Sequence, residues 1–372
     1  MRPAFSSTKQ AAAFAFLLLF LLAAPWLSAK KIIPPPKPSY SSESIKWEYF
    51  AWVQKFIFEE TNDIDIAFVG SSHMEHGIDT PYVQQKLDER LGHPTVVRSI
   101  CWAGAGFDGL YFFTRDLLEH RHVKTLVFYD ETSGKTPNEV HPFATHWFRF
   151  REAGEVLSGL PVADQAKYYF ASVIGMPRNL LELFTPNLAR DTNSTRISNH
   201  FLEKAATEPE TRLGSMSTRL GFDPITGEIG TPFTPYVPAT KVASNDVRIY
   251  SPETASDFVF SNQPLPAFQT YFARQFGLMV KKHGCKLVLL HLPVSAERIA
   301  PAMIESRYWP DLLQTEVCVM GIPGKQLFAG VSETEIGRLY TDPVHLNENG
   351  QKYFTPLITP ALLQFYESHF AR

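Results

Sequence analysis

Apolar positions along this chain follow two periodicities that succeed one another. Ile64–Val69 is an alternating apolar run typical of a buried strand, whereas Phe268–His283 repeats its apolar residues at helical spacing. Strands that alternate with helices at short spacing are typical of βαβ units, so we expect an α/β fold with a central parallel sheet. The predicted strands are Ile64–Val69, Thr95–Ile100, Thr125–Tyr129 and Lys286–Leu290, with a weak strand near Gln326–Phe328. The predicted helices are Ser44–Glu60, Pro81–Leu91, Leu110–His120, Phe268–His283, Ala296–Glu305 and Gly350–Tyr366.

This alternation breaks down between about residues 139 and 266. Helical pieces are predicted at Phe148–Leu157, Asp164–Ile174 and Asn179–Phe184. They are followed by "RLGFDPITGEIGTPFTPYVPAT", whose glycine, proline and threonine residues indicate loops or short hairpins. We expect an insertion over one edge of the sheet that shapes a substrate groove.

The N-terminal segment predicts export. Ala11–Leu27 carries no charge over 17 residues, which is the short limit for a membrane-spanning helix and slightly more than the usual apolar core of a signal peptide. Basic residues flank both ends, so the positive-inside rule does not decide the orientation. We expect residues 1–29 to be a transmembrane anchor or a signal peptide, 30–43 a proline-rich linker, and 44–372 the α/β domain. The domain is then extracytoplasmic, held by a single-pass helix or secreted if the segment is cleaved.

Composition narrows the function classes. A chain of 372 residues with 44% hydrophobic residues can bury a large core. Its formal charge of −3 leaves no basic excess for a phosphate backbone, so we expect no nucleic-acid partner. Cys101, Cys285 and Cys318 lack both CxxC spacing and an even count, which predicts neither a zinc site nor a disulfide framework.

Two short polar segments carry candidate chemistry. The first strand ends in Gly70-Ser71-Ser72-His73, at the carboxyl edge where parallel sheets bind ligands. Near the C-terminus, "YTDPVHLNENG" places Asp342 three residues before His345 in a turn. A carboxylate beside an imidazole fixes its tautomer and stabilises its protonated form. Taken separately, the first segment also fits a helix cap, and the second fits a capping aspartate with an exposed histidine.

Taken together, these segments resemble the SGNH (GDSL-type) hydrolase superfamily. The resemblance covers about Asp65–Thr132 and Lys286–Phe365 and leaves the insertion unmatched. It implies a flavodoxin-like three-layer sandwich. The family places its nucleophile third in a Gly-Asp-Ser turn and its catalytic pair in a D-x-x-H near the C-terminus. Carried onto this chain, the resemblance implies that Ser72 is the nucleophile, His345 the base and Asp342 its orienting residue, with Ser71 standing where the family has Asp.

The same resemblance implies an oxyanion hole. The family's second block falls on "CWAGAG", so Gly106 offers a backbone N–H alongside that of Ser72; Gly104 competes for this role, and a plain tight turn is the alternative. The third block departs from the family, because "FYDETSG" supplies Asp130, Glu131 and Thr132 but no asparagine. Losing one such donor typically costs about a hundred- to a thousandfold in rate. Either Thr132 or a side chain of the insertion substitutes, or turnover is slow.

The layout of the whole chain is similar to membrane-anchored SGNH proteins of cell-envelope acylation, such as those of alginate O-acetylation and of D-alanyl transfer to teichoic acid. This similarity implies a serine esterase or O-acyltransferase that acts on acyl, and in particular acetyl, esters of an envelope polysaccharide. It implies a membrane-bound O-acyltransferase as a possible partner, and neither a metal nor another cofactor.

Two alternatives from other classes stay open. One is a metal-dependent phosphoesterase in which histidines favour zinc or manganese. The other is a non-catalytic scaffold that binds a glycan or an acyltransferase through a degenerate site, with aromatic residues of the insertion as the sugar platform. The candidate metal ligands are His73, His76, His291, Asp342 and His345, and the candidate platform residues are Trp147, Phe148, Phe150, Tyr168, Tyr169 and Phe170.

Overall fold

The computed structural model describes twelve stretches of the chain. They are residues 5–30, 32, 53, 55–102, 106–129, 140, 157–171, 173, 233–239, 248–249, 265–298 and 308–370. The chain divides into two compact units, residues 1–44 with 139–191 and residues 45–138 with 192–372, which we describe separately.

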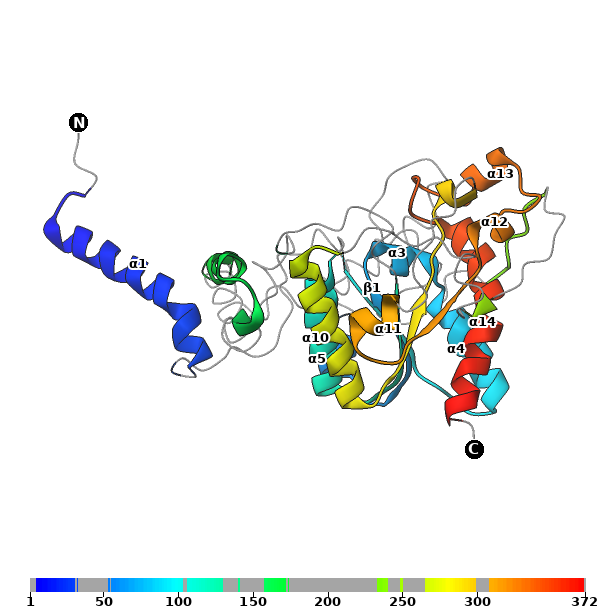
Figure 1. Cartoon of the computed structure of the whole chain (residues 1–372), viewed down its shortest axis with the longest axis horizontal. Coiled ribbons are helices and arrows are strands. Elements are labelled where there is room, and N and C mark those ends of the chain that lie inside the picture. Colours follow the sequence, from blue (N-terminus) through cyan, green and yellow to red (C-terminus); the bar gives the residue numbers. More distant parts are fainter. Residues whose placement is uncertain are drawn as a thin grey trace. The chain divides into compact units, whose positions relative to one another are not determined.

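The first unit contains the N-terminal helix α1, Thr8–Ala29 (Figure 1). Its 22 residues span about 33 Å at 1.5 Å per residue, and it is long and apolar enough to cross a membrane. It extends beyond the predicted apolar segment at both ends. A signal sequence passes the same test, so both predicted roles stay open. Residues 162–171 are also helical, and the Tyr169 hydroxyl donates a hydrogen bond to the Leu22 carbonyl.

The second unit is built on a sheet with five parallel strands. Along the sheet these lie in the order β2 (Val97–Cys101), β1 (Ile64–Gly70), β3 (Val123–Tyr129), β5 (Lys286–Leu290) and β6 (Cys318–Gly321). The short strand β4, Arg248–Ile249, pairs antiparallel with β6 at one edge. Strand β4 lies within the predicted insertion, most of which is outside the described residues.

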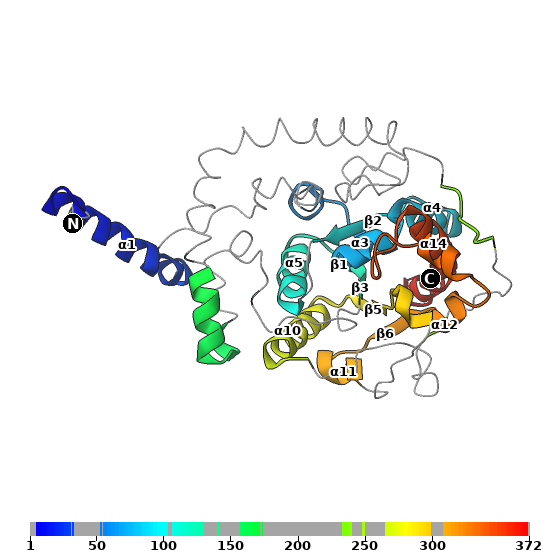
Figure 2. The same cartoon turned by 90° about the horizontal axis from the view of Figure 1, so that it is seen from above.

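Helices lie on both faces of this sheet (Figure 2), consistent with a three-layer arrangement. On one face, α10 (Ala267–His283) contacts both α5 (Phe107–His120) and α11 (Tyr308–Leu313). On the other, α14 (Glu348–Phe370) contacts α3 (Ser72–Gly77) and α4 (Thr80–Leu91). The shorter helical segments are η2 (Lys55–Glu59), η4 (Leu157–Gly159, in the first unit), η7 (Ser295–Arg298), α12 (Gly324–Leu327) and α13 (Glu333–Gly337).

The strands bury side chains on both faces. Ile66 and Phe68 of β1 belong to one core cluster with Phe354 of α14. Phe128 of β3 packs against Phe276 of α10, with ring centroids 5.2 Å apart. Because successive side chains of a strand point to opposite faces, a strand covered on both sides is apolar at nearly every position. This is why the sequence pattern locates the central strands.

Several predicted elements are confirmed and others are not. The four main strands lie within two residues of their predicted bounds. The weak strand near Gln326–Phe328 is wrong, because Gly324–Leu327 is helix α12 and the fifth parallel strand is the earlier Cys318–Gly321. Pro323 at the N-cap of α12 fits a helix start and not a central strand. The predicted pieces Phe148–Leu157, Asn179–Phe184, Ser44–Glu60 and Ala296–Glu305 lie wholly or mostly outside the described residues.

Candidate active site

Ser72 follows β1, the strand from which successive chain connections lead to opposite sides of the sheet. From β1 the chain forms β2 on one side and then crosses to form β3 on the other. In open α/β sheets, ligands bind beyond the carboxyl ends of the strands at such a switch point. Figure 1 shows α3, the helix that begins with Ser72, directly beyond the end of β1.

The glycine before the two serines is required by close packing. A Cβ atom on Gly70 would lie 2.8 Å from the Cβ of Met74 in α3. Ser71 is the N-cap residue of α3 but makes no side-chain cap hydrogen bond. It is 1% exposed, and its Oγ has no hydrogen-bond partner among the described residues. Ser71 therefore occupies the cap position, but its hydroxyl does not act as a cap. Capping also gives no reason for a hydroxyl at Ser72.

The D-x-x-H turn folds around the carboxylate of Asp342. Its Oδ1 accepts hydrogen bonds from the backbone N–H groups of Val344, at 2.9 Å, and His345, at 2.8 Å. Its Oδ2 lies 2.7 Å from Nδ1 of His345. Partial burial opposes ionisation, but these backbone hydrogen bonds and the His345 ring outweigh it and lower the pKa of Asp342 to about 2. Asp342 is therefore ionised at neutral pH.

The other nitrogen of the same imidazole meets Ser72. Nε2 of His345 lies 2.8 Å from Oγ of Ser72. An anionic carboxylate can only accept, so Nδ1 carries the proton and Nε2 accepts from the hydroxyl. The structure thus brings the three predicted catalytic residues into one line of hydrogen bonds. Such a line can remove a proton from the serine hydroxyl and hold it on the imidazole.

Hydrogen bonds among backbone groups and the Asn347 side chain hold the turn. The N–H of Thr341 donates to the His345 carbonyl at 2.9 Å. Nδ2 of Asn347 donates to the carbonyls of Arg338, at 2.9 Å, and Tyr340, at 3.2 Å, while its Oδ1 accepts from the Gly350 N–H. Asn347 therefore joins the turn to the start of α14, which gives the "LNENG" segment a structural role.

A loop after β5 holds the turn from its other side. The N–H and Oγ of Ser295 both donate to the Pro343 carbonyl, at 3.1 and 2.8 Å. This loop is closed by a buried pair in which Nε2 of His291 lies 2.8 Å from Oε2 of Glu297. His291 is a candidate ligand in the metal-dependent alternative; in the structure its Nε2 contacts Glu297 and so anchors the loop. Glu297 carries no motif signal in the sequence.

Two further imidazoles surround His345. The His73 ring stacks on the His345 ring, with centroids 4.4 Å apart and an interplanar angle of 26°. It also stacks on Tyr129 at 5.0 Å and 15°. His76 meets His345 edge-on at 5.5 Å. Burial, and then the nearby His345, lower the pKa of His73 to about 4, so His73 is neutral at neutral pH.

The predicted oxyanion donors are placed only in part. Gly106 is the N-cap residue of α5 with φ of 149°, a conformation that favours glycine. It follows β2, whose Cys101 is in register with Gly70, so it lies at the same sheet edge as Ser72. Gly104 and Thr132 lie outside the described residues. The roles of Gly106 and Thr132 stay predictions.

Among the described residues, no group of three or more histidine, cysteine, aspartate or glutamate residues can hold a metal ion. Cys101, Cys285 and Cys318 form no disulfide bond with one another. Burial raises the pKa of Cys285 and Cys318 to about 11, so neither is a reactive thiolate at neutral pH.

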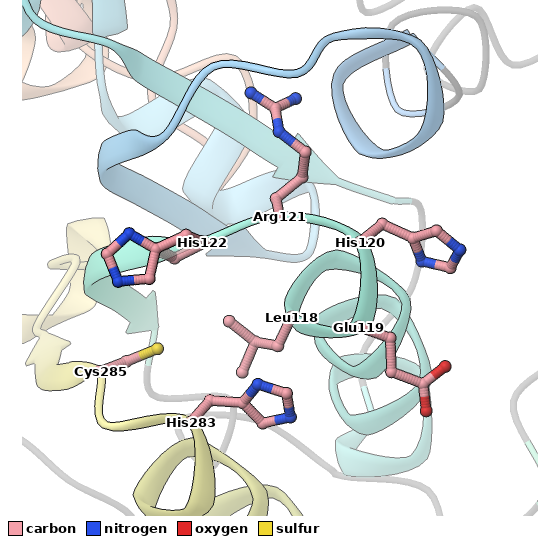
Figure 3. Close-up of a pocket in the computed structure, with 8 residues that line it drawn as sticks. Leu118, Glu119, His120, Arg121, His122, His283 and Cys285 are labelled. Atoms are coloured by element: carbon pink, nitrogen blue, oxygen red, sulfur yellow. The ribbon is translucent and has the colours of Figure 1, made fainter.

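A shallow cavity of about 310 Å³ lies at the amino ends of strands β3 and β5, whereas Ser72 lies beyond the carboxyl end of β1 (Figure 3). His120 and His122 point in opposite directions there. The cavity therefore does not gather its histidines around one point, and it is separate from the serine site.

The predicted sugar platform is described only in part. Tyr168 is 2% exposed and belongs to the packed interior of the first unit, while Phe170 is 57% exposed. Trp147, Phe148 and Phe150 lie outside the described residues.

No model of a known protein family matches the chain, and no curated protein matches it either.

Proposed function

We propose that this protein is a serine acyl-ester hydrolase or O-acyltransferase with Ser72, His345 and Asp342 as its catalytic triad. The observation that carries the proposal is the hydrogen-bonded line from Asp342 Oδ2 through the His345 ring to Ser72 Oγ, with contacts of 2.7 and 2.8 Å. A lone serine at a helix start needs no such partners. The carboxylate of Asp342 is ionised, as an orienting residue must be.

The proposed reaction has two steps. In the first, Nε2 of His345 takes the Ser72 proton while Oγ attacks an ester carbonyl; the bond to the leaving alcohol breaks, and His345 gives that alcohol the proton. In the second, His345 deprotonates a water molecule or a sugar hydroxyl, which attacks the acyl-serine; the bond from the acyl group to Oγ breaks, and His345 returns the proton to Ser72. Water gives hydrolysis and a sugar gives transfer. The backbone N–H groups of Ser72 and Gly106 are the proposed oxyanion donors, with Thr132 as a third.

The fold supports the proposed membership of the SGNH hydrolase superfamily. Counting only the parallel strands, the sheet has the order 2-1-3-4-5, which is that of flavodoxin-like doubly wound sheets. The nucleophile follows the first of these strands, and the D-x-x-H turn directly precedes the last helix, as the resemblance implies.

The proposed setting is the cell envelope. Helix α1 can anchor the chain, and we propose that the catalytic domain is extracytoplasmic. The proposed substrate is an acyl, and in particular an acetyl, ester of an envelope polysaccharide, with a membrane-bound O-acyltransferase as partner. No observation on the described residues favours the metal-dependent or the scaffold alternative over this one.

The full-length chain in detergent provides the test. Wild type should release acetate from 4-nitrophenyl acetate and from an acetylated polysaccharide, and an added sugar acceptor would divert the acetyl group if transfer prevails. Ser72→Ala should lower turnover by at least about a thousandfold. Ser71→Ala is the matched control, because it removes a neighbouring hydroxyl that makes no hydrogen bond among the described residues. Equal activity of wild type and Ser72→Ala would contradict the proposal.

A further inference from the structure

His73 lies beside the proposed triad, and the proposed reaction gives it no role. It directly follows Ser72 in α3, yet neither of the hydrogen bonds that define the triad involves it. Its ring stacks on the catalytic imidazole and on Tyr129, the last residue of β3. His73 therefore links the base of the proposed triad to the buried end of a central strand.

The two hydrogen bonds of His345 do not by themselves fix the tilt of its ring. They act at Nδ1 and at Nε2, whose N–H bond and lone pair lie in the plane of a neutral imidazole. A small rotation about the line through these nitrogens, made by combined changes in the two side-chain torsions, would keep both nitrogens near their partners but change the tilt of the ring toward Ser72. A flat ring against the face of the imidazole opposes that rotation, and stacked aromatic pairs are favourable beyond their buried area.

The charge state of His73 suits this contact. Burial first, and then the nearness of His345, lower the pKa of His73 to about 4, although Asp342 opposes the shift. His73 therefore remains neutral while His345 gains a proton during the proposed reaction. The other titratable neighbours are His76, edge-on to His345, and Tyr129 beneath His73. A cation in place of His73 would repel the imidazolium.

We infer that His73 is a positioning residue that holds the plane of the His345 imidazole by stacking between it and Tyr129. The inference rests on the proposed function. This role requires a flat, uncharged ring, and it does not depend on the ring nitrogens of His73. It follows that phenylalanine can replace His73, whereas a branched or flexible side chain of similar size cannot.

The test measures how fast a fluorophosphonate reagent modifies Ser72 in the full-length chain, because this rate reports activation of the hydroxyl without requiring the natural substrate. His73→Phe keeps a flat ring, His73→Leu is apolar without one, and His73→Gln is a second ring-free variant. The melting temperature of each variant reports whether it folds. We expect His73→Phe to react within about threefold of wild type, and the ring-free variants to react at least about tenfold more slowly at unchanged melting temperature.

The remaining outcomes separate this inference from the proposed function. Ring-free variants that react as fast as wild type would overturn the positioning role. A folded His73→Phe as slow as His73→Leu would also overturn it, because the reaction would then need a nitrogen of His73. Wild type that does not react, or Ser72→Ala that reacts equally, would instead contradict the triad itself, and the inference with it.

Discussion

Nε2 of His345 lies 2.8 Å from Oγ of Ser72, although 273 positions separate the two residues in the sequence. This contact joins the end of the first strand to the turn before the last helix. Its geometry depends on two supports, the packing of α3 on β1 and the hydrogen-bond network of the 338–350 segment. Each support can be weakened separately, without touching the three proposed catalytic side chains.

The first prediction concerns Gly70. Its replacement by alanine places a Cβ atom 2.8 Å from the Cβ of Met74, which must displace α3 and with it Ser72. We expect Gly70→Ala to slow fluorophosphonate labelling by at least about tenfold. Gly337→Ala is the control, since nothing lies within 4 Å of the added Cβ. Equal labelling rates of the two variants would show that the strand end tolerates the methyl group.

The second prediction concerns Asn347. Asn347→Asp keeps the acceptor for the Gly350 N–H but loses both donors to the carbonyls of Arg338 and Tyr340. Each hydrogen bond contributes about 0.5–1.5 kcal/mol, so the free energy of unfolding should fall by about 1–3 kcal/mol. Labelling of Ser72 should also become slower. Asn349→Asp is the control, because the hydrogen bond of Asn349 to the Arg338 carbonyl is long, at 3.4 Å, and exposed. Denaturant unfolding measures the free energy of unfolding of both variants. An equal loss of this free energy in Asn347→Asp and Asn349→Asp would contradict the role of Asn347.

The third prediction concerns Asp342. Asp342→Asn keeps the shape of the side chain, but its amide can donate to Nδ1 of His345 and so leave the proton on Nε2. That tautomer cannot accept the Ser72 proton, so we expect turnover to fall by at least about a thousandfold. The amide oxygen can still accept from the N–H groups of Val344 and His345, so the variant should fold, and its melting temperature checks this. A variant that keeps most of its turnover would mean that the carboxylate does not orient the base.

The fourth prediction concerns pH and the N-cap of α4. Burial raises the pKa of Asp79 to about 6, even though its carboxylate accepts a hydrogen bond from the Tyr82 N–H. The folded chain then holds a proton that the unfolded chain releases near pH 3.8, so Asp79 lowers stability as pH rises from about 4 to above 6. Asparagine also caps helices and carries no charge. Asp79→Asn should therefore melt like wild type at pH 4 and higher than wild type at pH 8, and a pH-independent difference would contradict the shift.

The sequence predicts those parts of the fold that depend on local periodicity. Val123–Tyr129 and Lys286–Leu290 are apolar on both faces, so their strands are recognisable without any neighbour. The four-residue strand Cys318–Gly321 is too short to show a hydrophobic period. The helix Ser72–Gly77 has only six residues, which is also too few to show helical spacing. Short elements depend on contacts from elsewhere in the chain, which the local pattern does not contain.

In the candidate site, too, the sequence predicts the residues of local motifs but not the contacts between distant segments. Ser72, Asp342 and His345 are predicted because their motifs are local and resemble those of a known superfamily. The stack of His73 on His345 and the buried pair of His291 with Glu297 depend on how separate segments approach one another. Histidines that look like metal ligands in sequence therefore have other contacts in the fold.

Mapping the labelled residue tests the central claim most directly. After reaction of the full-length chain with a fluorophosphonate, peptide mass spectrometry should locate a single stoichiometric adduct on Ser72, and His345→Ala should abolish it. An adduct on Ser71 or elsewhere, or an adduct on Ser72 that forms equally fast in His345→Ala, would contradict the proposed triad.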